Sequence, residues 1–396
     1  MAMDKVIVKS FCKKLSDQPF TLKLWDGEEI NYGEGTPKFK VVINEFPTKK
    51  ELLADASIAL GEAYLDGKID LEGNLQEIFE SIMRQSDSFL NESILLKFVG
   101  KIASNSKAKS KADIASHYDI GNDFYSIWLD ETMSYSCGYF KNEDDSLYDA
   151  QMNKIHHILK KLNLKEGQTL LDVGCGWGYL IIEAAKLYKV KAMGITLSEE
   201  QYKKGQERIK EQGLEDLVEI KLMDYRDLKK SGLEFDRVVS VGMAEHVGHN
   251  NLPLYFENIH AVLKKSGLFL LHNITNPIET EGNHFITKYI FPGGYLPTGR
   301  EEMHIAADLD FRVIDVESLR LHYMKTLMHW LDNFDANIDK VKEIEMCDER
   351  FIRMWRLYLA SCAAAFHYWT IDIHQMLFSK GTNNNLPMTR KYLYED

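Results

Sequence analysis

The chain has few cysteines, and their spacing excludes two classes of protein. Among 396 residues there are only five: Cys12, Cys137, Cys175, Cys347 and Cys362. The number is odd and no C-x-x-C pair occurs, so the pattern fits neither a zinc site nor a disulfide framework. We therefore expect a reduced, cytoplasmic protein that holds no metal.

Positive charge and long apolar runs are also scarce. The 48 lysines and arginines are outnumbered by 60 acidic residues, which gives a formal net charge of −12. Binding to nucleic acid generally needs a basic footprint, so no nucleic-acid partner is expected. No run of 18 apolar residues predicts a membrane span. Residues 1–12 lack the apolar core of a signal peptide.

The most informative stretch that is present is L-L-D-V-G-C-G-W-G, Leu170–Gly178. The apolar run Thr169–Val173, which overlaps the start of this stretch, predicts a strand, and Tyr179–Tyr188 after it predicts a buried helix. This unit opens an α/β sheet, whose ligands bind beyond the carboxyl ends of the strands. The G-x-G-x-G spacing, with no carboxylate after the second strand until Glu199, disfavours a dinucleotide. A glycine-rich turn without a ligand is the alternative.

Strands and helices alternate after this motif. Further strands are predicted at Lys191–Ile195, Val218–Leu222, Phe235–Val241, Leu268–Ile274 and Phe311–Val316, with helices at Glu200–Gln212 and Leu252–Leu263. This alternation predicts a Rossmann-like α/β domain over residues 113–396, with a mostly parallel sheet and helices on both faces. Residues 275–305 break the pattern and predict an insertion that covers the site. Two long helices are predicted at Leu321–Ile344 and Asp348–Phe378.

Residues 1–95 predict a separate small α+β domain. Strands are expected at Phe20–Trp25, Glu28–Tyr32 and Phe39–Ile43, and T-K-K-E at Thr48–Glu51 fits a capping box at the start of a helix. We find no catalytic constellation in this domain, which is interpreted as a module for lipid docking or oligomerisation.

A Lys/Ser-rich stretch at residues 96–112 predicts a linker. It holds five lysines and no acidic residue. Such a run is either a solvated segment or a patch attracted to anionic lipid, where each basic residue contributes about 1 kcal/mol.

Polar side chains gather where a pocket of this fold would draw them. Glu245 and His246 follow the strand Phe235–Val241, and His272 lies inside an otherwise apolar strand, where its ring nitrogens need partners. Taken singly, each has a structural interpretation as a satisfied core group. A metal site from His246, His249, Glu245 and His272 matches no familiar zinc spacing.

Taken together, six strings in one order point to a family. They are H-Y-D, S-Y-S-C, L-L-D-V-G-C-G-W-G, G-I-T-L-S, V-G-M-A-E-H-V-G and G-L-F-L-L-H-N-I, from about Ile114 onward. The glycine string resembles the first motif of S-adenosylmethionine-dependent methyltransferases. The whole set resembles the cyclopropane-fatty-acyl-phospholipid synthases, with the mycolic acid cyclopropane synthases as close relatives. The extra N-terminal domain resembles the phospholipid-type bacterial enzymes.

The resemblance implies a fold, a reaction and a cofactor. The fold is a class I methyltransferase with a seven-stranded sheet. S-Adenosyl-L-methionine supplies a methylene group to the cis double bond of unsaturated acyl chains in membrane phospholipids, and a cyclopropane ring forms. Enzyme-bound bicarbonate acts as general base. The family also implies a homodimer in peripheral contact with the inner face of the cell membrane.

The site residues implied by the resemblance fall into two groups. The bicarbonate pocket falls on Cys137, Glu245, His272, the backbone N–H of Ile274, and Tyr323. The cofactor site falls on Tyr118, Tyr135, Ser136, Gly174, Gly176, Thr196, Leu197, Gln201 and Gly242, with Asp224, Tyr225 and Arg226 at the adenine. Because a carboxylate beside an anion is a like-charge contact, we expect a raised pKa at Glu245 or a bridging proton.

Two other functions stay open at this point. A methyltransferase with another acceptor would make a methyl-branched lipid or modify a small soluble nucleophile, and it would not need the anion pocket. A cofactor- or lipid-binding module without activity is the non-enzymatic alternative.

Overall fold

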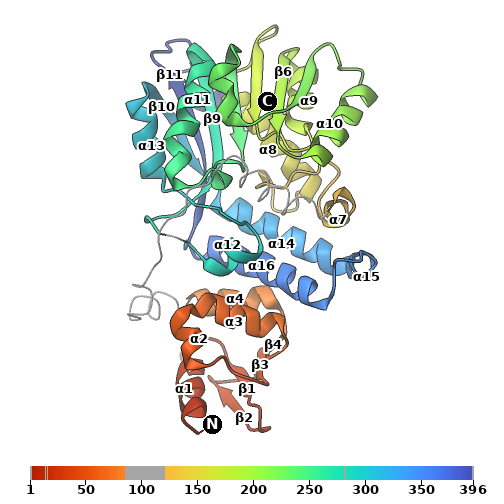
Figure 1. The fold of residues 1–396 in the computed structure, drawn as a ribbon, viewed down its shortest axis with the longest axis vertical. Helices are drawn as coiled ribbons and strands as arrows, with labels where there is room; N and C mark the ends of the chain where they lie inside the picture. Colours follow the sequence, from red (N-terminus) through yellow and green to blue (C-terminus); the bar gives the residue numbers. More distant parts are fainter. Residues whose placement is uncertain (1, 14, 16, 85–120, 281, 395–396) are drawn as a thin grey trace. The chain divides into compact units, whose positions relative to one another are not determined.

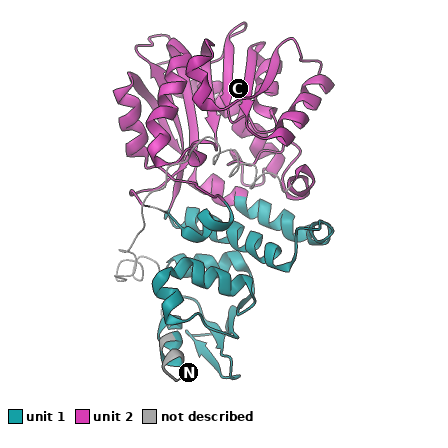
Figure 2. Cartoon of the chain, in the orientation of Figure 1, with its two compact units in different colours: residues 1–101, 281–290, 327–370 teal, residues 102–280, 291–326, 371–396 magenta. Residues whose placement is uncertain are grey.

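A computed structural model describes residues 2–13, 15, 17–84, 121–280 and 282–394. The chain forms two compact units, coloured separately in Figure 2. Unit 1 comprises residues 1–101, 281–290 and 327–370, and unit 2 comprises residues 102–280, 291–326 and 371–396. The predicted linker at 96–112 lies outside the described residues, and so does Tyr118.

Unit 2 is built on a seven-stranded sheet (Figure 1). Its strands, in spatial order, are β10 (Phe311–Ser318), β11 (Asp372–Lys380), β9 (Leu263–Thr275), β8 (Phe235–Val241), β5 (Thr169–Val173), β6 (Lys191–Thr196) and β7 (Val218–Leu222). Strands β5 to β9 pair in parallel, whereas β11 runs antiparallel to both β9 and β10. The predicted mostly parallel sheet is confirmed.

Helices cover both faces of this sheet because successive strand residues point to opposite sides. Leu170 packs among residues of α8 (Leu147–Lys161), α9 (Tyr179–Tyr188) and α10 (Glu199–Glu211). Its neighbour Leu171 packs with α11 (Leu252–Val262) and α13 (Gly299–Asp308) on the other face. Shorter elements of unit 2 are α7 (Asn122–Trp128), η2 (Tyr225–Lys230), η3 (Ala244–His246), η4 (His249–Asn251) and α17 (Lys391–Tyr394).

Unit 1 contains a four-stranded sheet in the order β2 (Glu29–Tyr32), β1 (Phe20–Lys23), β3 (Phe39–Ile43) and β4 (Ile69–Glu72). Its N-terminal helices are α1 (Ala2–Cys12), α2 (Lys49–Ala54), α3 (Ala56–Leu65) and α4 (Leu75–Arg84). The predicted capping box is present, since the Thr48 side chain accepts from the N–H of Glu51 and the Glu51 carboxylate accepts from the N–H of Thr48. Strand β4 was not predicted.

Later segments of the chain complete unit 1. They are α12 (His284–Tyr289), the second half of α14 (Arg320–Ala336), α15 (Ile338–Lys342) and α16 (Glu349–His367). The ring of Phe285 in α12 lies so close to Gly61 in α3 that a Cβ there would come within 2.3 Å of it. Residues 1–84 therefore share a compact unit with helices that the sequence placed in the catalytic domain.

The two long C-terminal helices were predicted wrongly. The first is interrupted at Asn337, between α14 and α15. The second ends at His367 instead of Phe378, and residues 372–380 form β11. Trp369 follows the helix with φ of 59°, a left-handed conformation in which a helix cannot continue. Among the described residues, no helix is both long and apolar enough to cross a membrane.

Candidate active site

The loop between β5 and α9 is shaped by its glycines. Gly174, Gly176 and Gly178 have φ values of 85°, 54° and 78°. At Gly174 an added Cβ would also lie 2.8 Å from the side chain of Met243. The loop is tied to the next strand, because the N–H groups of Gly174 and Cys175 both donate to the Ile195 carbonyl at 3.0 Å. Only glycine gives this turn without strain and without filling the space in front of it.

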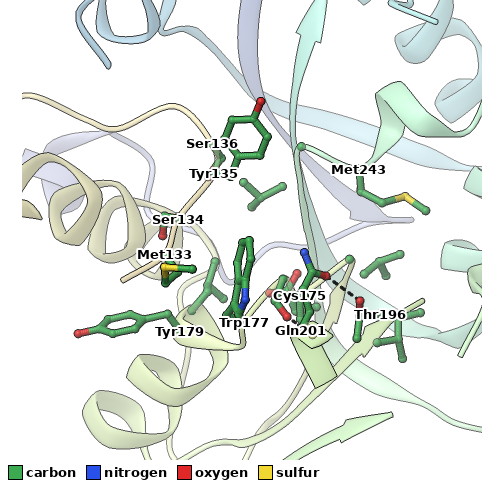
Figure 3. A pocket seen from close by; sticks show the side chains of 18 of the residues that line it. Met133, Ser134, Tyr135, Ser136, Cys175, Trp177, Tyr179, Thr196, Gln201 and Met243 are labelled. Atoms are coloured by element: carbon green, nitrogen blue, oxygen red, sulfur yellow. Dashed lines mark hydrogen bonds between the residues drawn. The ribbon is translucent and has the colours of Figure 1, made fainter. Parts of the chain in front are cut away.

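A cavity of about 990 Å³, open to solvent, lies in front of this loop (Figure 3). Nine of the predicted cofactor residues line it: Tyr135, Ser136, Gly174, Gly176, Thr196, Leu197, Gln201, Tyr225 and Gly242. Asp224 and Arg226 are not in its wall. They form a two-pronged ion pair with each other, with nitrogen–oxygen distances of 2.8 and 2.6 Å.

The end of β6 presents an oriented amide to this cavity. The Thr196 hydroxyl donates to the side-chain oxygen of Gln201 at 2.8 Å (Figure 3). Ser198 caps α10 by accepting from the Gln201 N–H at 3.3 Å. With its oxygen engaged, Gln201 keeps its amide nitrogen as a donor for a ligand.

The Glu245 carboxyl is buried beside the cavity. Its Oε1 accepts a hydrogen bond from the Ile274 N–H at 2.8 Å. Its Oε2 is buried and has no hydrogen-bond partner among the residues that the structure describes. Burial raises the pKa of Glu245 to about 7, against an ordinary value of 4.5. The carboxyl is therefore poised to hold or release a proton near neutral pH. The raised pKa was expected from a neighbouring anion, whereas here burial causes it.

His272 is fully buried in β9 and neutral. Burial holds the pKa of His272 well below its ordinary value. The side-chain nitrogen of Gln375 in β11 donates to Nδ1 at 3.0 Å, which puts the imidazole hydrogen on Nε2. That Nε2 is buried without a partner in the described part of the chain. It is an unused donor.

The Cys137 thiol and the backbone N–H of Tyr323 both contact the carbonyl oxygen of Leu319. The Cys137 thiol lies 3.8 Å from the oxygen of Leu319, and the N–H of Tyr323 donates to that same oxygen at 3.0 Å. Both side chains are buried. Burial raises the pKa of the Cys137 thiol, so it stays protonated.

The sheet brings these groups to one end of unit 2. The Gly242 N–H at the end of β8 donates to the His272 carbonyl at 2.8 Å. The Leu319 N–H donates to the carbonyl of Ile373, which pairs with Ile274 across β11 and β9. All five predicted catalytic residues therefore lie at or near the same strand ends. Their roles stay predictions.

Sequence reasoning missed a second buried carboxyl, Glu302 in α13. Its Oε1 accepts from the Asn273 amide at 2.8 Å, and its Oε2 has no partner among the described side chains. Burial and the nearby charge of Glu245 raise the pKa of Glu302 well above its ordinary value. Its neighbour Glu301 completes a capping box with Thr298. In the sequence, Glu301 and Glu302 are therefore indistinguishable from the acidic residues that commonly begin a helix.

The insertion after β9 packs on the Glu245 loop. The Tyr295 N–H donates to the Glu245 carbonyl at 2.9 Å, and the Phe291 ring meets the His246 ring edge-to-face at 5.7 Å. His246 lines the cofactor cavity. Within the described ranges, no group of three or more His, Cys, Asp or Glu residues could hold a metal ion.

Comparison with known proteins identifies the family. Residues 105–376 match the family model described as mycolic acid cyclopropane synthetase, and residues 7–94 match a domain of unknown function. A probable fatty acid methyltransferase of Pseudomonas putida is 40% identical over 95% of this chain and 96% of its own. The cyclopropane-fatty-acyl-phospholipid synthase of Escherichia coli strain K12 is 39% identical over 86% of this chain and 88% of its own.

A solved structure shares the fold. It is a mycolic acid cyclopropane synthase, CmaA1, complexed with SAH and CTAB, with a TM-score of 0.64 and 35% identity. The match covers 68% of this chain and 98% of that one.

Proposed function

The chain belongs to the mycolic acid cyclopropane synthetase family, and on that premise we propose that it converts unsaturated acyl chains of membrane phospholipids into cyclopropane acyl chains. Membership makes it an S-adenosylmethionine-dependent methyltransferase. The proposal adds the acceptor, a cis double bond, and the base, an enzyme-bound bicarbonate.

The cavity in front of the glycine loop fits the cofactor. Gly176 leaves the backbone open to close approach, since an added Cβ would meet nothing within 4 Å. Gln201 offers an oriented amide donor, and the aromatic ring of Tyr225 lies in the wall. When bound, S-adenosylmethionine supplies an electrophilic methyl group on a sulfonium sulfur.

One observation carries the choice of base: two buried polar atoms, Glu245 Oε2 and His272 Nε2, have no partner among the described residues. Buried polar groups are normally satisfied, so these two atoms support a small polar ligand as their missing partner. When bound there, bicarbonate supplies the base that removes a proton. His272 would donate from Nε2, and Glu245 would donate when protonated.

The other predicted groups suit the same ligand. The Tyr323 hydroxyl is a further donor in the buried region. The Cys137 thiol donates to the Gly138 carbonyl at 3.2 Å, so it serves an anion only by giving up that contact. The Ile274 N–H is already donated to Glu245, so it serves an anion only by sharing that hydrogen bond. An ionised Glu245 would repel a bound anion. Because its pKa is raised to about 7, the carboxyl can be protonated at neutral pH and then does not repel the anion.

The protein must also protect a cation in the acyl chain. The new carbon–carbon bond forms as the methyl–sulfur bond breaks, which leaves the alkene carbon positively charged. Loss of a proton from the added methyl group then closes the ring. The insertion packed on Glu245 and the aromatic rings of Tyr135 and Phe291 would exclude water and face the cation.

The test is product analysis on lipid vesicles. The protein is incubated with S-adenosylmethionine, bicarbonate and vesicles of a cis-unsaturated phospholipid, and the acyl chains are analysed by mass spectrometry and proton NMR. We expect a gain of one CH₂ and cyclopropane proton signals. A methylated alkene would give the same mass without those signals and would favour the alternative acceptor chemistry. No lipid product at all would refute the proposal.

We further propose that the protein works as a homodimer in the cytoplasm, bound peripherally to the inner face of the cell membrane. Support comes from the family and from the lysines between residues 97 and 111. Binding to anionic vesicles should weaken with added salt, because surface charges are screened over about 8 Å at physiological ionic strength. Flotation that is independent of salt would count against the lysines, and a monomer by light scattering would count against the dimer.

A further inference from the structure

A buried lysine in α8 lines the cofactor cavity, and no motif singled it out. Lys154 is 3% exposed and lies in the cavity wall together with Ser136 and Asp172. The proposed reaction gives it no role. A lysine so deeply buried is rare unless something pairs with it.

The ammonium group of Lys154 is only partly satisfied. Its Nζ donates to the Ser136 hydroxyl oxygen at 3.0 Å. Among the described residues, Lys154 makes no other hydrogen bond and no ion pair. An ammonium carries three hydrogens, so two remain available, and Lys154 lies in the cavity wall. The carboxyls of Asp130 and Asp172 act on this cation electrostatically but form no ion pair with it, so a negatively charged ligand in the cavity would complete its contacts.

Lys154 stays charged despite its burial. Burial lowers its pKa to about 8, while the carboxylates of Asp130 and Asp172 act in the opposite direction. The side chain is mostly cationic at neutral pH.

The hydrogen bond between Lys154 and Ser136 also orients the hydroxyl. Because the Ser136 oxygen accepts from Lys154, its own hydrogen is free to donate to a ligand. Gln151, one helical turn before Lys154, holds the loop by donating to the Ser136 carbonyl at 2.8 Å. Two donors therefore lie together at the cavity wall: the charged Lys154 in α8 and the Ser136 hydroxyl in the loop that Gln151 holds.

We propose that Lys154 is a cofactor-binding residue that holds the α-carboxylate of S-adenosylmethionine together with the Ser136 hydroxyl. The carboxylate is the only anionic group of that molecule, whereas its sulfonium and ammonium groups are positive. A buried cation in the wall therefore selects the carboxylate end. The inference rests on the cofactor of the proposed function and is independent of the acceptor lipid.

Calorimetry with two ligands tests this role. S-Adenosylhomocysteine and its decarboxylated analogue, which ends in a propylamine, are titrated into the wild type, Lys154→Met and a surface control, Lys165→Met. Lys165 is exposed beyond the end of α8. Replacing Lys154 should weaken S-adenosylhomocysteine about tenfold to a hundredfold and change the analogue less than twofold. The control should bind both ligands like the wild type.

Three results would overturn the inference. Equal weakening of both ligands would mean that Lys154 only positions the loop. Unchanged binding of S-adenosylhomocysteine would remove the contact altogether. If Lys154→Met fails to fold, the wild type alone decides, because equal affinity for the two ligands would refute a carboxylate contact. A wild type that binds S-adenosylhomocysteine normally but makes no cyclopropane would instead refute the proposed acceptor.

Discussion

Glu245 is held by the backbone of Ile274, two residues after His272 in the same strand. The Ile274 N–H donates to Oε1 at 2.8 Å and fixes the carboxyl against the end of β9. The second oxygen stays buried and without a partner in the described structure. Such a group is costly to ionise, and the protein keeps it where a satisfied or apolar side chain would be more stable.

The first prediction concerns the pH dependence of stability. Glu245 has a raised pKa of about 7 in the folded protein, against an ordinary 4.5, so its protonated form stabilises the fold. That contribution is complete below pH 4.5 and is lost as the pH rises through 7. Glu245→Gln should remove it, a change in the free energy of unfolding of at most about 3 kcal/mol between pH 5 and pH 8.

Urea unfolding of the two proteins at both pH values, in bicarbonate-free buffer, measures the difference. Asp172 also has a raised pKa, and it titrates alike in both proteins. The pKa of Glu302 is raised partly by the charge of Glu245, so both proteins also carry Glu302→Gln. Parallel pH profiles would show that Glu245 is already ionised or solvated. In the vesicle assay, the same variant should lose about a hundredfold in turnover or more, as expected for a group in the proton-transfer site.

The second prediction concerns the tautomer of His272. Gln375 donates to Nδ1 at 3.0 Å and so keeps the hydrogen on Nε2. Gln375→Glu replaces that donor by an acceptor, and the imidazole hydrogen should move to Nδ1. Turnover on vesicles should fall about tenfold or more, while calorimetric binding of S-adenosylhomocysteine stays unchanged. ¹⁵N NMR of the histidine ring reports the tautomer, and an unmoved hydrogen would contradict the assignment.

Gln375 also shows where the sequence is uninformative. The stretch Asp372–Lys380 follows a long amphipathic helix and carries Ile373, Met376, Leu377 and Phe378, a spacing that a helix would share. Only tertiary pairing makes it a strand, because β9 and β10 leave a gap between them that β11 fills. The partner of His272 was therefore hidden in a segment predicted as helix.

The cofactor loop was predictable for the opposite reason. The sharp turn after Val173 requires positive φ at three positions, and glycine is the residue that supplies it, so chemistry and sequence coincide there. Lys154 and Glu302 gave no such signal. Each occupies an ordinary helical position, and only burial against a cavity or another carboxyl distinguishes it from a solvated side chain.

The third prediction compares alanine substitutions at two glycines with positive φ, one in the cofactor loop and one outside it. Both substitutions strain the backbone, but only the first adds an atom inside the cofactor site. Gly174→Ala adds a methyl group 2.8 Å from Met243 at a φ of 85°. We expect binding of S-adenosylhomocysteine to weaken by tenfold or more. Gly213→Ala is the matched control, since Gly213 has a φ of 62° and an added Cβ would meet nothing within 4 Å. The control should lose about 1 kcal/mol of stability and no affinity. Equal affinities in both variants would show that the loop adapts to the added methyl group.

The last prediction concerns what ties α16 to the N-terminal residues within unit 1. The Arg353 guanidinium donates to the Tyr64 carbonyl at 2.7 Å and the Ile69 carbonyl at 3.0 Å, and it lies 4.1 Å from the centre of the Tyr64 ring. It also pairs with Asp70 at 3.2 Å.

Arg353→Met keeps an unbranched apolar stem but leaves two carbonyls without their donor, so we expect a loss of about 2–3 kcal/mol in the free energy of unfolding. Lys68→Met, which breaks an exposed pair with Glu45 in the same unit, should cost less than about 1 kcal/mol. Urea unfolding measures both. If the two variants are equally stable, the contacts of Arg353 contribute no more than a surface ion pair, and α3, β4 and α16 must be held together by their apolar packing alone.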